Sequence, residues 1–93
     1  MIGRASEKVQ GGKLVKAEVE YGERIRRVKI TGDFFIYPEE AIGALEKSIV
    51  GAPASSSEEE LAEKVRNAAE ESGALLIGIT PEAVARVVKG AMK

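Results

Sequence analysis

The sequence predicts an α+β domain in which a three-stranded antiparallel sheet carries about three helices on one face. Two observations support this fold class. Residues 14–37 alternate apolar and polar side chains in short runs that glycines separate, which is typical of strands. Residues 38–93 instead repeat apolar side chains at helical spacing. Strands followed by helices, rather than alternating with them, indicate a segregated α+β arrangement.

The strands are predicted over residues 14–21, 25–31 and 34–37. In the first strand, apolar side chains at odd positions alternate with charged ones at even positions, which indicates that one face is buried. A short turn containing Gly22 joins the first two strands into an antiparallel hairpin. In the second strand Ile25 is out of phase with the apolar residues that follow, which predicts a β-bulge or a late start.

The first two helices are predicted from their capping signals. Pro38 is expected at the first position of a helix that Gly51 ends, because proline suits that position and glycine favours the end of a helix. Ser57 and Glu60 have the spacing of a capping box, which indicates the start of a second helix. Gly73 is expected to end that second helix.

The remaining segments lie at the two ends of the chain. Thr80 followed by Pro81 is expected to open the last helix. Residues 74–79 form a short apolar run between glycines, which fits either a buried extended segment or a strand. Residues 1–12 are polar and end in a Gly-Gly pair, so a flexible N-terminal arm is expected there. The folded domain is expected over residues 13–93.

The composition of the 93 residues predicts one domain and excludes several kinds of chemistry. The chain has no cysteine, which excludes disulfides, thiolate-bound metals and thiol nucleophiles. It also has no histidine, so the usual proton shuttle near neutral pH is missing. No apolar run approaches the length of a membrane span, and residues 1–10 carry no signal-peptide core. A soluble cytoplasmic protein without membrane contact is therefore expected.

Charge is nearly balanced overall but unevenly distributed. The net charge of −1 is made up of +3 over residues 1–37 and −4 over residues 38–93. A net charge near zero argues against broad nucleic-acid binding. A basic cluster nevertheless surrounds the start of the second strand, at Arg24, Arg26 and Arg27. This cluster fits either a solvated strand face that protects the sheet edge or a docking surface for an acidic partner.

No residue is predicted to be catalytic, and no metal site is predicted. The serines at 55–57 have no histidine to activate them, and serines before a helix are typical of loops and caps. The glutamates at 58–60 fall in a first helical turn, where the helix dipole favours negative charge. The Gly-Gly-Lys at 11–13 lacks the other residues of a phosphate-binding loop.

The most informative segment is Gly-Asp-Phe-Phe-Ile-Tyr at residues 32–37. Successive side chains of a strand point to opposite faces, so four large apolar residues in a row cannot all enter a core on one side. We therefore expect either Phe34 and Ile36 or Phe35 and Tyr37 to face outward as an interaction patch. The alternatives are a short strand buried on both faces, or a twist at the helix entry that turns one set inward.

A longer stretch around this segment resembles a known family. The run GGKLVKAEVEYGERIRRVKITGDFFIYPEEAIGALEKSIVG is similar to the C-terminal accessory domain of lipoate–protein ligases. The resemblance lies in a hairpin, a Gly-Asp-Phe-Phe element and a Pro-Glu helix start. The tail ITPEAVARVVKGAM resembles the last helix of that domain. Split ligases carry the domain as a separate small protein, and a 93-residue chain that begins with Met resembles that form.

The resemblance implies a non-catalytic accessory subunit with no active site of its own. The catalytic subunit of such a ligase uses lipoate and Mg-ATP to form lipoyl-adenylate, and transfers the lipoyl group to a lysine of an acceptor protein. The small subunit is needed mainly for adenylation, which implies that this chain alone binds no cofactor. The accessory fold is related to iron–sulfur scaffold and sulfur-acceptor proteins. Those relatives act through cysteines, which this chain lacks.

The expected partner is the catalytic subunit, with lipoyl-acceptor proteins as indirect partners. We expect the contact to involve Gly32, Asp33, Phe34, Phe35 and Tyr37, with the glycine allowing a close backbone approach. The three arginines of the basic cluster are a further expected contact. Two other functions stay open at this point: a generic protein-interaction or regulatory module, and a small RNA-binding domain that uses the basic second strand.

Overall fold

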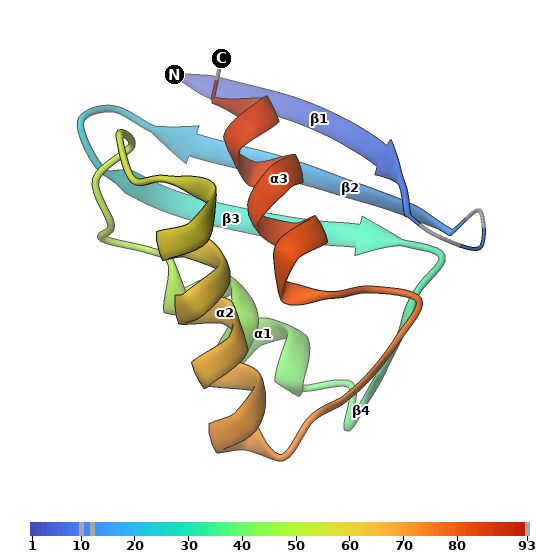
Figure 1. Cartoon of the computed structure of the whole chain (residues 1–93). Helices are drawn as coiled ribbons and strands as arrows, with labels where there is room; N and C mark the ends of the chain where they lie inside the picture. Colours follow the sequence, from blue (N-terminus) through green and yellow to red (C-terminus); the bar gives the residue numbers. More distant parts are fainter. Residues whose placement is uncertain (10, 12, 93) are drawn as a thin grey trace.

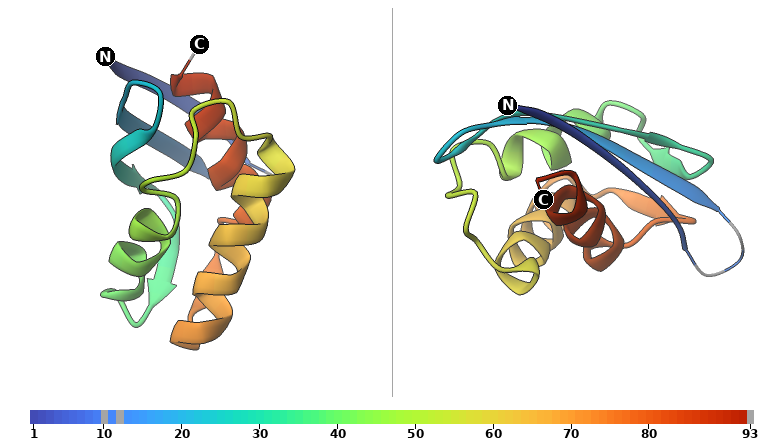
Figure 2. Two further views of the ribbon diagram at one scale, coloured as in Figure 1. Left: turned by 90° about the vertical axis from the view of Figure 1, so that its left-hand side faces the viewer. Right: turned by 90° about the horizontal axis from the view of Figure 1, so that it is seen from above.

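The computed structural model describes residues 1–9, 11 and 13–92. Its elements follow in the order β1 (Ile2–Lys8), β2 (Leu14–Tyr21), β3 (Ile25–Gly32), β4 (Phe35–Tyr37), α1 (Ala41–Ser48), α2 (Glu58–Ser72), β5 (Leu75–Ile77) and α3 (Pro81–Ala91). The strands β1, β2 and β3 form an antiparallel sheet in that spatial order, and the helices lie on one of its faces (Figures 1 and 2). The predicted α+β class with a three-stranded antiparallel sheet is confirmed.

The first strand lies where the sequence predicts a flexible arm. Residues 2–8 pair with β2 along their whole length. The prediction of an arm over residues 1–12 is therefore wrong for this segment, and two of the predicted arm residues, Gln10 and Gly12, lie outside the described residues.

The sequence hides this strand because its inward positions hold small or charged residues. Gly3, Ala5 and Glu7 alternate with more exposed neighbours, so the segment lacks the large apolar side chains that usually mark a strand. Tight packing against α3 requires the small residues. A Cβ atom at Gly3 would lie 1.6 Å from the carbonyl oxygen of Ala91 at the end of that helix, so a larger residue cannot fit.

The segment predicted as the third strand of the sheet pairs elsewhere. Strand β4 does not extend the sheet but pairs antiparallel with β5, so the two form a separate two-stranded unit that we name the β4–β5 ribbon. The chain leaves the sheet at Gly32, whose φ of +151° is rarely adopted by other residues. The apolar run at 74–79 thus contains a strand, one of the two alternatives that the sequence left open.

Local capping chemistry sets the starts of α2 and α3 as predicted. The Ser57 hydroxyl accepts a hydrogen bond from the Glu60 amide at 3.1 Å, and the Glu60 carboxylate accepts one from the Ser57 amide at 2.9 Å. This reciprocal pair is a complete capping box. At α3 the Thr80 hydroxyl accepts from the Ala83 amide at 3.0 Å.

Helix α1 starts later than the sequence predicts. Pro38 is not its first residue, because the helix begins at Ala41 after an N-cap at Glu40. The amide of Ala41 donates to the carbonyl of Pro38 at 3.0 Å, and the next amide repeats this spacing to Glu39 at 3.2 Å. These bonds span three residues rather than four, so the segment after proline forms a tighter turn that leads into the helix.

The core lies between the sheet and the helices. Helix α3 packs across β1 and β2, α1 packs against β3, and α2 packs against both other helices. The predicted bulge is present, because the β2–β3 register shifts between Glu20 and Tyr21 and lets Ile25 and Val28 both point inward. The largest fully buried side chains are Ile25, Leu45, Ile49, Leu61, Val15, Val19, Val65, Val84 and Val88. In the described part of the chain, no helix combines the length and the apolar character that crossing a membrane requires.

Candidate functional site

Four large apolar side chains are exposed together on the β4–β5 ribbon. Phe35 and Tyr37 of β4 are 56% and 65% exposed, and Leu75 and Ile77 of β5 are 57% and 52% exposed. In the ladder, Phe35 lies opposite Ile77 and Tyr37 lies opposite Leu75. Directly opposed residues share a face of a two-stranded unit, so the four side chains form one surface, which we name the ribbon patch.

The other face of the ribbon belongs to the core. Ile36 is buried, and Leu76 opposite it is partly buried and packs against the core. Phe34 lies just before β4 and also packs against the core. Of the alternatives that the sequence left open, the structure therefore places Phe35 and Tyr37 outward. The exposed apolar surface expected in this segment is present, and its contact with a partner stays a prediction.

The turn before the ribbon is fixed by contacts within the chain. The Asp33 amide donates to the carbonyl oxygen of Leu14 at 2.8 Å. A Cβ atom at Gly32 would lie 2.0 Å from the same oxygen. The close backbone approach that the glycine allows is thus made to β2 of this chain. Asp33 itself is exposed and borders the ribbon patch in the sequence.

An open groove of about 310 Å³ adjoins the ribbon patch on the side of α1. It is lined by Ile30, Thr31, Gly32, Phe34, Phe35, Ile36, Glu39 and Ile42. Over the described ranges, no group of three or more His, Cys, Asp or Glu side chains is placed to hold a metal ion. The ribbon patch consists of apolar and phenolic side chains beside an open groove, which suits contact with another protein.

The basic cluster does not join this surface. It lies at the start of β3, at the opposite end of an eight-residue strand that is about 26 Å long. Arg24 donates to the carbonyl oxygen of Gly51 at 2.7 Å, which ties the strand to the loop after α1. Arg27 pairs with Glu18 at 3.3 Å on the outer face of the sheet. Arg26 lies at the bulge. The three arginines therefore have different surroundings and do not form one surface.

Leu75 and Ile77 are the patch residues that the sequence did not single out. Their segment contains three apolar residues in a row, and the same alternation that sends Phe35 outward would send either Leu76 or its two neighbours outward. The sequence therefore contains the alternation that exposes these residues. It does not show that β5 pairs with β4, and this pairing brings Leu75 and Ile77 beside Phe35 and Tyr37.

Comparison with known proteins gives one similar solved structure. The sequence matches no protein-family model and no curated protein. A chain from the structural analysis of an archaeal lipoylation system, a bi-partite lipoate protein ligase and its E2 lipoyl domain from Thermoplasma acidophilum, superposes with a TM-score of 0.74 at 28% sequence identity. This chain is similar to a component of a lipoylation system. The match covers 95% of this chain and 94% of the Thermoplasma chain, so the two have nearly the same length.

Proposed function

We propose that this chain is the accessory subunit of a two-polypeptide lipoate–protein ligase. The observation that carries the proposal is the similarity to a chain of a bi-partite lipoate protein ligase system over 95% of this chain. The likeness includes 28% identical residues as well as the fold, and the two chains have nearly equal lengths. The resemblance of the Gly-Asp-Phe-Phe segment and the last helix to ligase accessory domains points the same way.

In this proposal the catalytic partner carries the chemistry. The partner binds lipoate and Mg-ATP, forms lipoyl-adenylate and modifies a lysine of the acceptor protein, while this chain alone binds neither substrate. The composition supports that division, since the chain contains neither cysteine nor histidine. Its contribution is contact. A docked accessory chain can order a loop of the partner, align the lipoate carboxylate with the ATP α-phosphate and exclude water during adenylation.

The ribbon patch is the proposed docking surface for the catalytic subunit. Two aromatic and two aliphatic side chains, each more than half exposed, would lose contact with water when another protein covers them. Aromatic anchors at the centre of an interface commonly carry most of its affinity. Asp33 follows the sheet immediately before the ribbon and supplies a polar group at the rim of this surface.

The accessory role is tested by the release of pyrophosphate from ATP and lipoate by a lipoate–protein ligase catalytic subunit of the same organism. We expect the full chain to stimulate release at least tenfold and to co-elute with the catalytic subunit. Absence of both stimulation and complex formation would contradict the proposed function.

The docking surface is tested separately with the double variant F35E/I77E. Both side chains are exposed and opposite each other, so the fold should persist while the centre of the ribbon patch becomes charged. We expect the affinity for the catalytic subunit to fall about 100-fold. V50E is a control that introduces one charge, because Val50 is also an exposed apolar residue but lies in the turn after α1. Equal affinities of the two folded variants would mean that the ribbon patch is not the docking surface. The proposed accessory role would be unaffected by that result.

A further inference from the structure

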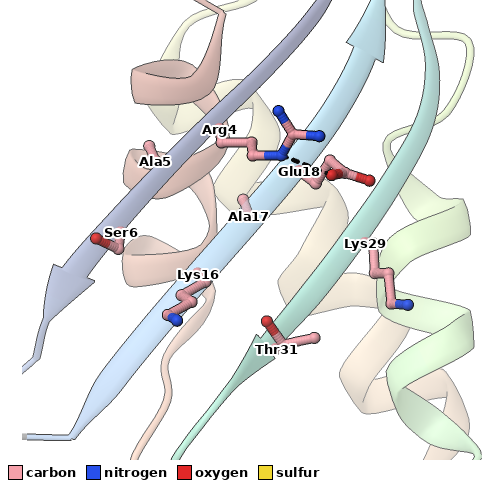
Figure 3. Close-up of a pocket in the computed structure, with 8 residues that line it drawn as sticks. All are labelled: Arg4, Ala5, Ser6, Lys16, Ala17, Glu18, Lys29 and Thr31. Atoms are coloured by element: carbon pink, nitrogen blue, oxygen red, sulfur yellow. Dashed lines mark hydrogen bonds and ion pairs between the residues drawn. The ribbon is translucent and has the colours of Figure 1, made fainter.

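The outer face of the three-stranded sheet presents its side chains in rows that cross the strands. The β1–β2 and β2–β3 registers place Ser6 and Thr31 on either side of Lys16, and they place one basic residue on either side of Glu18 in the next row. Figure 3 shows the two rows side by side. The residues of these rows are Arg4, Ser6, Lys16, Glu18, Lys29 and Thr31.

Glu18 is already occupied by two guanidinium groups. Its carboxylate oxygens accept from Arg4 at 2.8 Å and from Arg27 at 3.3 Å, and the first of these bonds is drawn in Figure 3. The hydrogen bond from Arg4 is the main cause that lowers the pKa of the Glu18 carboxyl. Lys29 lies directly opposite Glu18 in the ladder but forms no ion pair within the described part of the chain.

Lys16 has hydroxyl groups rather than carboxylates on both sides. Ser6 of β1 and Thr31 of β3 are its neighbours across the strands, and no ion pair of Lys16 occurs among residues 1–9, 11 and 13–92. None of the lysines in the described part of the chain forms an ion pair, and Lys16 and Lys29 differ from the others because the strand registers place both beside one open hollow. An open hollow of about 490 Å³ lies among these side chains, and we name it the lysine hollow. Besides the two ammonium groups and the two hydroxyls, it is lined by Arg4 and by Glu18, whose carboxylate is already paired with two arginines.

We propose that the lysine hollow docks an acidic polypeptide segment of a partner protein. The argument is charge complementarity. The outward-facing residues of the three strands include five basic side chains and only two carboxylates. The face is therefore basic, although the net charge of the whole chain is −1. A partner segment with several carboxylates would give these two ammonium groups the counter-charges that the described part of the chain does not supply. The surface is separate from the ribbon patch, and the proposal does not depend on the proposed function.

The surroundings favour a polypeptide carboxylate over phosphate. The hollow is centred on β2, whose main-chain groups pair with β1 on one side and with β3 on the other, so this strand offers no amide cradle of the kind that phosphate sites commonly have. None of the outward side chains of β1, β2 and β3 is aromatic, whereas single-stranded nucleic acid is bound through aromatic stacking. Flexible lysines on an open face suit several carboxylates at varied positions.

The binding test is an NMR titration of the full ¹⁵N-labelled chain with an end-blocked hexaglutamate peptide at low salt. We expect the amide resonances of Ser6, Lys16, Lys29 and Thr31 to shift, with an affinity that falls as salt is raised. Absence of shifts in these residues at millimolar peptide would overturn the proposal. Parallel titrations use inorganic pyrophosphate and hexauridylate. Tighter binding of either at the same amides would also overturn it, in favour of a phosphate or nucleic-acid surface.

Variants separate local charge from net charge. The affinity of K16E/K29E for hexaglutamate should be at least tenfold lower, because the charge of both lysines of the hollow is reversed. K47E/K64E is the matched control, since it makes the same change of net charge on two exposed helical lysines. If the two double variants lose affinity equally, the hollow has no specific role. K16Q/K29Q serves where charge reversal beside Glu18 disturbs the fold, and it should lose at least threefold.

Discussion

Two surfaces of this protein are sheet faces without a helix over them, and they differ in chemistry. The outer face of the three-stranded sheet is charged, and its carboxylate at Glu18 is held by two arginines. The ribbon patch carries four large side chains without a charge, each more than half exposed. A charged face remains hydrated and is stable in water by itself. An exposed apolar face gains free energy when another surface covers it, so the ribbon patch is the better candidate for a permanent contact.

The comparison also separates two ways in which a short chain binds partners. The ribbon patch offers apolar area, which contributes to affinity and is insensitive to salt. The lysine hollow offers two ammonium groups that form no ion pair with the described residues. They contribute to orientation and to the rate of encounter, and salt screens them. Raising the salt concentration should therefore weaken any contact at the hollow while sparing a contact at the ribbon patch.

The largest effect is expected at the joint between the two surfaces, where the chain passes from β3 to the ribbon. Gly32→Ala would place a Cβ atom 2.0 Å from the Leu14 carbonyl oxygen, at a φ of +151° that alanine rarely adopts. We expect it to lower the free energy of unfolding by about 3 kcal/mol in urea denaturation.

The matched control for this change lies in α1. Gly43→Ala adds the same methyl group where no atom lies within 4 Å, and should stabilise the protein by about 0.5–1 kcal/mol. Equal stabilities of the two variants would mean that the joint tolerates a side chain and that the ribbon is not fixed to the sheet in this way.

An intermediate effect is expected where the inner side of the charged sheet meets α3. The Arg86 guanidinium donates to both carboxylate oxygens of Glu7, at 2.9 Å from Nε and 2.7 Å from Nη2. This hydrogen bond is the main cause that lowers the pKa of the Glu7 carboxyl below its ordinary value of 4.5. A carboxyl with a lowered folded-state pKa stabilises the fold above its unfolded-state value, and this stabilisation is lost as the pH falls through the folded-state value.

Glu7→Gln should therefore cost about 1 kcal/mol of unfolding free energy at pH 7, and this difference from the wild type should shrink as the pH drops below 4.5. Denaturation curves between pH 7 and pH 2 measure it. Glu70→Gln, on the exposed side of α2, is the control and should differ little from the wild type throughout. A cost that is the same at pH 2 and pH 7 would argue against the ion pair as its origin.

The smallest effect is expected on the outer face itself. Glu18→Gln removes the carboxylate that Arg4 and Arg27 share, but all three side chains are in contact with solvent. We expect a slight decrease of Tm at low ionic strength that disappears in 1 M NaCl, because salt screens exposed charges. A decrease that persists in high salt would show that packing, and not charge, holds this row.

The structure confirms much of what local sequence patterns predict. The hairpin of β2 and β3, its bulge near Ile25 and the capping box at Ser57 are all present. Each depends on residues close together in the sequence, where backbone conformation and hydrogen bonding decide the outcome. The outward direction of Phe35 and Tyr37 is one of the alternatives that the sequence leaves open, and the structure decides between them.

Patterns of this kind fail where small residues or distant segments decide. The sequence pattern does not predict strand β1, because its inward residues, among them Gly3 and Ala5, are small enough for α3 to pack closely on them. The ribbon patch was half predicted, because the exposure of Leu75 and Ile77 beside the two aromatic residues depends on the pairing of β4 with β5. No local pattern specifies which strand a three-residue segment will pair with.

The sequence by itself determined the fold class and the absence of cysteine and histidine chemistry, since composition and local alternation suffice for both. Only the tertiary structure decided which segment completes the sheet, where the four exposed apolar side chains meet and which lysines lie beside the same hollow. The physical reason is that these outcomes depend on contacts between residues far apart in the chain. Such contacts form only when the whole core packs and the loops between the segments close.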